Sequence, residues 1–342
     1  MTTSGSSTDR DRIRAALDEL ALPSGHRLAT RFVTEVLQLI DGEPDVLNLK
    51  IASAAVAEMA DAFEMFAPYA DVPKVTIFGS ARTEPDDPTY AHTVEVARQL
   101  AAKGWMVVTG AGPGIMEAGM IGAGRKNSIG VSIRLPFETD TNPVIAGDDK
   151  HVAMKYFFTR KLMLVKESAG FISLPGGFGT LDETFELLTL NQTGKGIPAP
   201  VVFLDTPDDS YWADVDRFIR EVLITRGLVS EADTSLYTVT DSCQQATEVI
   251  TGFYANYHSI RRIGDDLVIR LRRAPTDAQL SELNERFGHL VSSGTIRRTS
   301  ASGVEQRQHD ALDMERIVFH FNQYAYAELH DLIRALNALG AS

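Results

Sequence analysis

The fold is indicated by a stretch of nine residues, Pro175-Gly176-Gly177-Phe178-Gly179-Thr180-Leu181-Asp182-Glu183. A short apolar run, Gly170 to Leu174, precedes it and is typical of a buried strand, and residues 184–191 follow it with apolar side chains at helical spacing. A strand that turns into a helix through glycines and a threonine is typical of a phosphate-binding turn, because backbone N–H groups can approach an anion closely there and the helix N-terminus carries partial positive charge. The simpler alternative is a tight turn whose two acids, expected in the first helical turn, only suit the helix dipole. Three glycines, a threonine and a following carboxylate favour the phosphate site.

Two further turns rich in small residues precede this one. They are Phe78-Gly79-Ser80-Ala81-Arg82 and Thr109-Gly110-Ala111-Gly112-Pro113-Gly114. Turns at the carboxyl ends of neighbouring parallel strands line one crevice, so we expect all three to contact the same ligand. The candidate phosphate and substrate contacts are Ser80, Arg82, Gly110, Gly112, Gly114, Gly176, Gly177, Gly179 and Thr180.

The second turn only partly resembles a dinucleotide-binding fingerprint. Its third glycine is Gly114, whereas the G-x-G-x-x-G pattern needs one at 115, and residues 132–134 at the end of the next apolar run include no acid. The P-loop pattern is also absent from the sequence. A single cysteine and eight scattered histidines offer no metal-ligand cluster. We therefore expect neither a cofactor nor a metal.

Between about residues 74 and 225, short apolar runs alternate with segments of helical periodicity. This alternation predicts an α/β fold with a Rossmann-like, doubly wound parallel sheet. The expected strands are 75–78, 106–108, 129–133, 171–174 and 201–204. The expected helices are 89–103, 114–125, 155–167, 181–193 and 211–225.

Shifts in pattern divide the chain into four expected parts. Residues 1–24 are polar and predict a disordered or poorly ordered start, and 25–72 predict an N-terminal helical extension. Residues 73–257 are expected to form one nucleotide-binding catalytic domain with the Rossmann-like sheet. Residues 258–342 predict a small α+β module, ferredoxin-like or ACT-like, which serves either in packing and oligomerisation or as a small-molecule sensor.

Composition limits the classes of partner and the compartment. A formal net charge of −13 argues against general nucleic-acid binding, although it leaves room for one small phosphorylated ligand. No apolar run reaches the roughly 18 residues of a membrane span. One cysteine, Cys243, excludes an internal disulfide and suits a reducing compartment, so we expect a cytoplasmic protein.

The nine-residue stretch resembles the signature of the LOG family, the cytokinin riboside 5′-monophosphate phosphoribohydrolases formerly labelled lysine decarboxylases. The resemblance runs from about Lys74 to about Tyr257 and includes an Arg-Lys pair, Arg160-Lys161. It implies that Glu183 is catalytic and that Arg160 is its partner. The residues around the signature are more similar to the longer bacterial subgroup than to the short plant-type enzymes.

A phosphate-binding turn with a carboxylate and an arginine suits hydrolysis of the N-glycosidic bond of a nucleoside 5′-monophosphate. A carboxylate stabilises the oxocarbenium-like transition state, and the bound phosphate orients the sugar. We expect AMP-like or N6-modified (cytokinin) nucleotides to give free base and ribose 5-phosphate. Lys161 is expected to be accessory, and Met154 to line the base pocket with neighbouring aromatic residues and Met116 and Glu117.

Three other functions stay open at this point. The chain could be a nucleotide sensor or a cofactor carrier without turnover, or a nucleotide hydrolase that its C-terminal module regulates. A pyridoxal-phosphate decarboxylase would need a Schiff-base lysine, and only a phosphate-binding turn is evident. Apolar faces around Phe63–Phe66 and Leu187–Leu188, together with the family resemblance, predict at least a homodimer with its active site near the subunit boundary.

Overall fold

The computed structural model describes residues 15, 19, 26–134 and 142–339 of the 342-residue chain. The chain forms two compact units, residues 1–60 and 61–342. The first contains helix α2 (His26–Asp41) and most of helix α3 (Val46–Phe66), whose N-terminal end is capped where Asp45 accepts a hydrogen bond of 2.8 Å from the Asn48 N–H. The expected disordered start, residues 1–24, lies outside the described residues except for Ala15 and Glu19.

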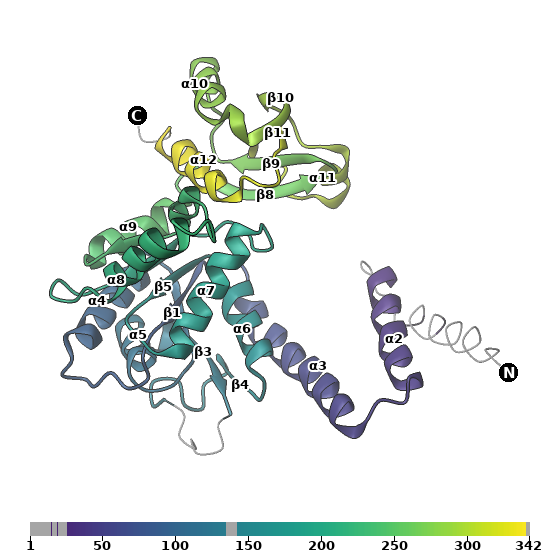
Figure 1. Cartoon of the computed structure of the whole chain (residues 1–342). Helices are drawn as coiled ribbons and strands as arrows, with labels where there is room; N and C mark the ends of the chain where they lie inside the picture. The colour runs from purple at the N-terminus through teal and green to yellow at the C-terminus, as the bar shows by residue number, and fades with distance from the viewer. Residues whose placement is uncertain (1–14, 16–18, 20–25, 135–141, 340–342) are drawn as a thin grey trace. The chain divides into compact units, whose positions relative to one another are not determined.

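The second unit is built on a seven-stranded parallel sheet, which confirms the predicted Rossmann-like α/β fold (Figure 1). Its spatial order is β4-β3-β2-β1-β5-β6-β7. The strands are β1 (Lys74–Phe78), β2 (Met106–Thr109), β3 (Ser128–Ile133), β4 (His151–Met154), β5 (Gly170–Ser173), β6 (Val201–Leu204) and β7 (Thr238–Thr240). The direction of winding reverses between β1 and β5, and ligands of doubly wound sheets bind at such a switch point.

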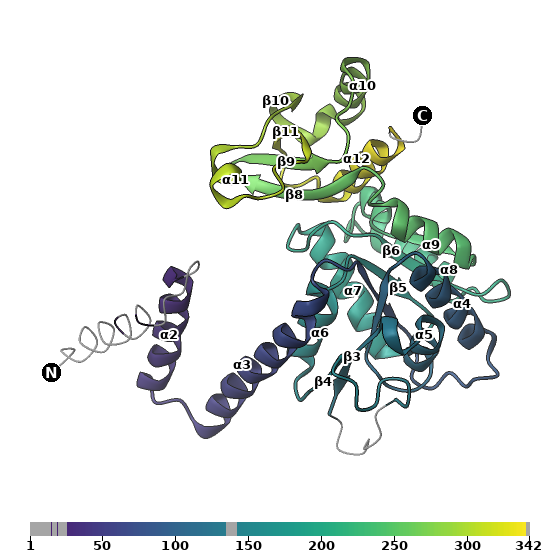
Figure 2. The ribbon, with the colours of Figure 1, turned by 180° about the vertical axis from the view of Figure 1, so that it is seen from behind.

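In the described part of the chain, six α-helices cover the two faces of this sheet. They are α4 (Pro88–Ala102), α5 (Ile115–Ala123), α6 (Phe157–Lys166), α7 (Phe178–Gln192), α8 (Tyr211–Phe218) and α9 (Cys243–Gly252). Helices α4, α5 and α9 share one apolar core with the sheet, and Figure 2 shows α4 alongside α9, where Thr247 donates a hydrogen bond of 3.1 Å to Gln99. Helices α6, α7 and α8 pack on the other face. There the Thr76 hydroxyl donates a hydrogen bond of 2.8 Å to the Leu164 carbonyl oxygen of α6, the Ser173 and Thr184 hydroxyls join β5 to α7, and Phe203 of β6 stacks on Trp212 of α8.

The core explains the continuous apolar runs of the sequence. Side chains on both faces of the central strands are fully buried, for example Ile77 and Val202 on one face and Phe203 on the other, as expected for a parallel sheet covered on both sides. Phe66 and Leu187, which we expected to contribute to an oligomer surface, are each only 2% exposed. That expectation was wrong for these two residues, because helical periodicity does not distinguish packing within a chain from packing between chains.

Several elements differ from the expected ones. Strands β4 and β7 and helix α9 were not predicted, and the expected helix 211–225 continues after α8 as a π-helical segment, Ile219–Ile224. Strand β4 lies at the edge of the sheet, and its side chains alternate between half-buried and buried. It therefore lacks the continuous apolar run by which central strands are recognised.

The C-terminal part forms a four-stranded antiparallel sheet of order β10-β11-β9-β8. Its elements are β8 (Tyr257–Ile263), β9 (Asp266–Leu271), α10 (Asp277–Phe287), β10 (Val291–Arg298), α11 (Gly303–Gln308), β11 (Glu315–Phe321) and α12 (Tyr326–Ala338). Helices α10 and α12 share one apolar core with the sheet, so both cover the same face. This confirms the small α+β module. Each strand has the same neighbours as in a ferredoxin-like sheet, but the chain enters the sheet at a different strand. Strand β8 and helix α11 were not predicted.

Helix α12 also contacts the larger sheet domain. The Ser235 hydroxyl donates a hydrogen bond of 2.9 Å to the Ala327 carbonyl oxygen, and Tyr326 packs against Gly194, just after α7. Gly194 has a φ of +65°, and a Cβ there would lie 2.0 Å from the Tyr326 ring. Among the described residues, no helix is long and apolar enough to cross a membrane.

We expect Gly194→Ala to lower the melting temperature more than Gly227→Ala. Gly227 has a similar φ of +67°, but a Cβ there would meet no described atom within 4 Å. Both changes introduce backbone strain of about 1 kcal/mol, and only Gly194→Ala adds a steric clash, which costs about 1–3 kcal/mol. Thermal unfolding of the two variants measures the difference. Equal losses of stability would show that Tyr326 does not pack tightly on Gly194.

Candidate active site

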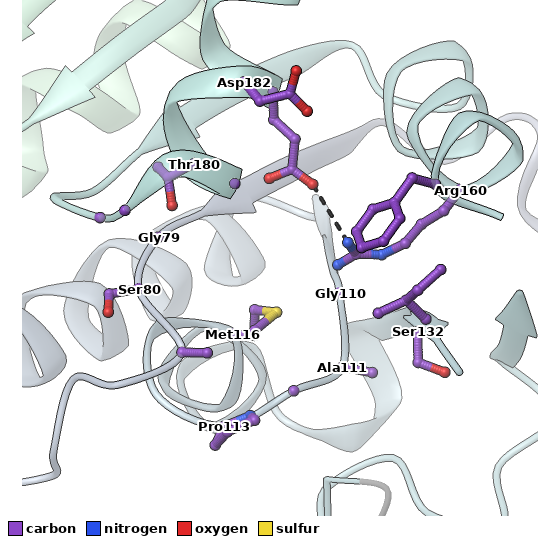
Figure 3. A pocket seen from close by; sticks show the side chains of 18 of the residues that line it. Gly79, Ser80, Gly110, Ala111, Pro113, Met116, Ser132, Arg160, Thr180 and Asp182 are labelled. Carbon is purple, nitrogen blue, oxygen red and sulfur yellow. Dashed lines mark ion pairs between the residues drawn. The ribbon is translucent and has the colours of Figure 1, made fainter. Parts of the chain in front are cut away.

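A pocket of about 990 Å³ opens at the carboxyl ends of the strands around the switch point (Figure 3). The three small-residue turns predicted from the sequence all line it, together with the ends of β3 and β4 and the first turns of α6 and α7. The expectation that these turns share one crevice is therefore met by the geometry. The predicted site residues that line the pocket are Ser80, Arg82, Gly110, Gly112, Arg160, Lys161, Gly176, Gly177, Gly179, Thr180 and Glu183.

One wall of the pocket is the turn between β5 and α7. A Cβ on Gly177 or Gly179 would meet no described atom within 4 Å, so backbone is accessible there. Among the described side chains, none caps the N-terminus of α7, and its first N–H groups are left for a ligand. Gly176 is packed instead, since a Cβ there would lie 2.2 Å from the Thr180 hydroxyl oxygen. This wall has the properties of an anion site.

Helix α7 begins at Phe178, three residues before the expected start. Gly179 and Thr180 therefore belong to the first turn, and Asp182 and Glu183 lie in the second. The prediction that the two acids sit in the first helical turn was wrong. The cause is the first two glycines of the signature, which allow the chain to enter the helix immediately after them.

The centre of the pocket holds an ion pair between helices α6 and α7. The Arg160 Nη1 and the Glu183 Oε1 are 3.6 Å apart, and the two side chains are only 10% and 14% exposed. The Arg160 Nε donates a hydrogen bond of 3.0 Å to the Val131 carbonyl oxygen in β3. A Cβ on Gly110 would lie 1.9 Å from the Arg160 Nη2. Residue 110 must therefore lack a side chain for the guanidinium to reach Glu183.

Burial disfavours the charged form of both partners. It raises the pKa of Glu183 to about 7, an effect that Arg160 opposes and Asp182 reinforces. Burial also lowers the pKa of Arg160, and Glu183 opposes that shift. Arginine stays protonated because its ordinary pKa is so high. Near neutral pH, Glu183 therefore exists in both protonation states, which suits a group that accepts or donates a proton.

The neighbouring acid has a different role. Asp182 is 62% exposed and lies 3.1 Å from the Lys161 Nζ, which also pairs with Glu186. Burial lowers the pKa of Lys161, but hydrogen bonds to Glu186 and Asp182 outweigh burial and leave that pKa raised. Lys161 lines the pocket with its charge already paired, in keeping with an accessory role.

Three predicted contacts are not part of the pocket. Met154 is fully buried, because strand alternation points it to the face opposite His151 and Ala153, which do line the pocket. Gly114 is also absent from the lining. Its φ of +66° and the 2.4 Å that would separate a Cβ from the Ser80 carbonyl oxygen show that this glycine shapes the turn. Glu117, which we expected near the base, does not line the pocket.

Sequence reasoning missed one end of the pocket. Ser132, Ile133 and Arg134 at the end of β3, and His151 and Ala153 of β4, line it. Recognising the short edge strand β4 would have located His151, but its only sequence signal is four residues with two apolar side chains on one face. Among the described residues, no group of histidine, cysteine and acidic side chains is placed to hold a metal ion.

We expect the stability of the wild type and of Glu183→Gln to diverge with pH. The folded protein holds the Glu183 proton more tightly than the unfolded chain, so this group stabilises the fold fully below about pH 4.5 and loses that contribution as the pH rises to about 7. The variant lacks this titration. The melting temperature of the variant minus that of the wild type should therefore increase between pH 5 and 8. Parallel curves would contradict the raised pKa.

Comparison with known proteins matches the sheet domain to one family. Residues 106–250 match a family model described as "Possible lysine decarboxylase". A protein of Archaeoglobus fulgidus without an assigned function is 30% identical over 132 residues, which cover 37% of this chain and 85% of that protein.

Two enzymes with assigned names are also similar. A probable cytokinin riboside 5′-monophosphate phosphoribohydrolase of Oryza sativa is 27% identical over 48% of this chain and 76% of its own length. A cytokinin riboside 5′-monophosphate phosphoribohydrolase of Mycobacterium tuberculosis is 28% identical over 46% of this chain and 86% of its own length. Among solved structures, the molybdenum cofactor carrier protein of Chlamydomonas reinhardtii superimposes with a TM-score of 0.38 at 20% identity, over 53% of this chain and 96% of that protein. The signature, the Arg160–Glu183 pair and these sequence matches agree, and the chain belongs to the LOG family.

Proposed function

We propose that the protein is a nucleoside 5′-monophosphate phosphoribohydrolase, which releases the free base and ribose 5-phosphate. The observation that carries this proposal is the buried Arg160–Glu183 pair, which faces the same pocket as an uncapped helix N-terminus between accessible glycines. The names of the LOG relatives, which are phosphoribohydrolases of a riboside 5′-monophosphate, support it.

In this proposal the 5′-phosphate binds at the turn between β5 and α7. Backbone N–H groups of the first turn of α7 and the Thr180 hydroxyl donate hydrogen bonds to it, and Ser80 and Arg82 of the turn after β1 approach from the other side. The two turns are held together, since the Ser80 N–H donates a hydrogen bond of 3.2 Å to the Pro175 carbonyl oxygen. Binding energy at the phosphate fixes the position of the sugar.

The carboxylate of Glu183 then faces the anomeric carbon. The bond from C1′ to the base nitrogen breaks, the base leaves with the electron pair and takes up a proton, and a water oxygen bonds to C1′ and gives up a proton. The negative charge of the Glu183 carboxylate stabilises the oxocarbenium-like transition state. The same carboxylate accepts the proton that the water gives up. Arg160 favours the ionised carboxylate against the effect of burial. We assign catalysis to these two residues, and the neighbouring glycine turns to substrate binding.

The substrate we propose is AMP or an N6-modified adenine nucleotide. The pocket of about 990 Å³ is larger than the phosphate and sugar require, and Phe157 at its edge is 57% exposed. An apolar substituent on the base would find contacts there. We assign this chemistry to residues 73–257 and propose that residues 258–342 form a separate packing or regulatory module.

Pyridoxal phosphate, which the description "Possible lysine decarboxylase" would imply, does not fit this pocket. That cofactor needs a lysine that can lose its proton and form a Schiff base. Among the described residues that line the pocket, the lysine is Lys161. Burial lowers the pKa of this lysine, but its ion pairs with Glu186 and Asp182 outweigh burial, and the pKa is raised. A lysine held protonated in this way is a poor nucleophile.

Replacing the two neighbouring acids tests the assignment. Glu183→Gln keeps the size of the side chain but removes the charge, and we expect turnover of AMP to fall by about 10²-fold or more. Asp182→Asn serves as the matched control and should cost only a small factor, since that exposed carboxylate pairs with Lys161. Release of free adenine measures both. Equal losses would mean that the wrong carboxylate has been assigned, and no loss in either would leave a nucleotide-binding protein without turnover.

We also propose that the protein is at least a homodimer, with the pocket close to the subunit boundary. Two apolar side chains that line the pocket are exposed in the single chain, Phe157 (57%) and Phe178 (94%), and two more on the same helix as Phe157 are also exposed, Phe158 (52%) and Leu162 (46%). Clustered exposed apolar groups of this kind mark interaction surfaces. Light scattering should give a mass of at least twice the 37.4 kDa of one chain. A monomer at working concentration would refute the assembly.

A further inference from the structure

A serine and a histidine form a pair at the end of the pocket farthest from the β5–α7 turn. The Ser132 hydroxyl oxygen and the His151 Nε2 are 2.9 Å apart, and both side chains are half-buried and line the pocket. In Figure 3, Ser132 lies beside Arg160, across the pocket from Ser80 and Thr180. The phosphate and sugar contacts proposed above use neither residue of the pair.

The local structure brings these two side chains together. Strands β3 and β4 are parallel, with Gly130 paired to His151 and Ser132 paired to Ala153. The imidazole crosses over Gly130 to reach Ser132, two residues further along β3. A Cβ on Gly130 would lie 3.0 Å from the His151 Cδ2 and 3.0 Å from the Ala111 Cβ. The glycine at 130 therefore leaves the space that the imidazole uses.

The order of the strands gives the distance of the pair from the phosphate-binding turns. From β3 the sheet continues to β2, β1 and β5. Strands lie about 4.8 Å apart, so the pair is about 10 Å from the turn after β1 and about 14 Å from the turn after β5. The Arg160–Glu183 pair lies between, because Arg160 is bonded to Val131, the residue before Ser132. A nucleotide whose phosphate and sugar occupy their proposed places has its base beside Ser132.

We propose that Ser132 and His151 bind the hydrogen-bonding edge of the nucleotide base, an inference that rests on the proposed function. The hydrogen between the two atoms can belong to either. If His151 donates it, the serine hydroxyl is free to donate to a carbonyl oxygen or ring nitrogen of the base. If the serine donates it, its oxygen accepts from an exocyclic amino group. The pair therefore accepts both 6-amino and 6-oxo purine nucleotides.

The state of His151 agrees with this role. Burial lowers the pKa of His151, so the imidazole is neutral near pH 7 and has one donor and one acceptor nitrogen. A neutral pair can exchange the polarity of its hydrogen bond without placing a charge against the base.

Ser132→Ala and His151→Phe test the proposal, with Ser128→Ala as the matched control. Ser128 lies on the same strand, but its hydroxyl donates to the Gly124 carbonyl oxygen, and it does not line the pocket. For the wild type we expect kcat/KM on AMP and GMP to agree within about ten-fold. Ser132→Ala and His151→Phe should each lower kcat/KM on both nucleotides about ten-fold, mostly through KM, as expected for lost hydrogen bonds to bound substrate. Ribose 5-phosphate, which has no base, should bind all four proteins with affinities within about two-fold.

Four results would overturn the proposal. Unchanged kinetics in Ser132→Ala and His151→Phe would show that the pair does not touch the base. A parallel loss of ribose 5-phosphate affinity would show that it acts through the fold. A fall in kcat of about 10²-fold at constant KM would make Ser132 a catalytic group. A strong preference of the wild type for AMP or GMP would refute the exchangeable polarity.

Failure of the proposed function gives a different result. In that case the wild type releases no ribose 5-phosphate from any nucleotide. Calorimetry then tests the pair directly: AMP should bind Ser132→Ala and His151→Phe about ten-fold more weakly than the wild type and Ser128→Ala. Equal affinities for AMP would overturn the role of the pair.

Discussion

The site depends on burying the Glu183 carboxylate next to a buried arginine. Burial alone disfavours the charged form of both partners. The attraction between the two groups, 3.6 Å apart, offsets only part of the free-energy cost of removing their charges from water. The result is a carboxyl group with a pKa of about 7, close to the working pH of a proton-transfer group. An ion pair that only stabilised the fold would contribute little free energy when buried in this way. This is the physical reason for reading the pocket as a catalytic site.

Much of the surrounding structure provides space for this pair and for its ligand. Gly110 makes room for the Arg160 guanidinium, Gly130 for the His151 imidazole, and Gly176 for the Thr180 side chain. Gly177 and Gly179 leave backbone accessible at the start of α7 instead. The glycines of the region thus serve two separate purposes, since some admit a neighbouring side chain and others leave backbone N–H groups accessible from the pocket.

The parts of the site that lie within one continuous stretch could be predicted from the sequence. The strand, the glycine turn and the helix that contain Glu183 are all encoded locally, and so is the alternation that gives the α/β fold. The end of the pocket formed by Ser132 and His151 could not be predicted, because it depends on how β4 pairs with β3, and the four residues of β4, alternately half-buried and buried, carry no local signal of that contact. The same pairing turns Met154 away from the pocket and His151 towards it.

The most direct test of the central claim compares a nucleotide with its nucleoside. Purified protein is incubated with AMP or with adenosine, and free adenine and ribose 5-phosphate or ribose are measured over time. The proposed phosphate site at the start of α7 predicts that AMP is hydrolysed and that adenosine, which lacks the phosphate that orients the sugar, reacts at least about 10²-fold more slowly. Equal rates on AMP and adenosine would contradict the role of the β5–α7 turn. No cleavage of either would contradict the assignment of Glu183 and Arg160 to catalysis.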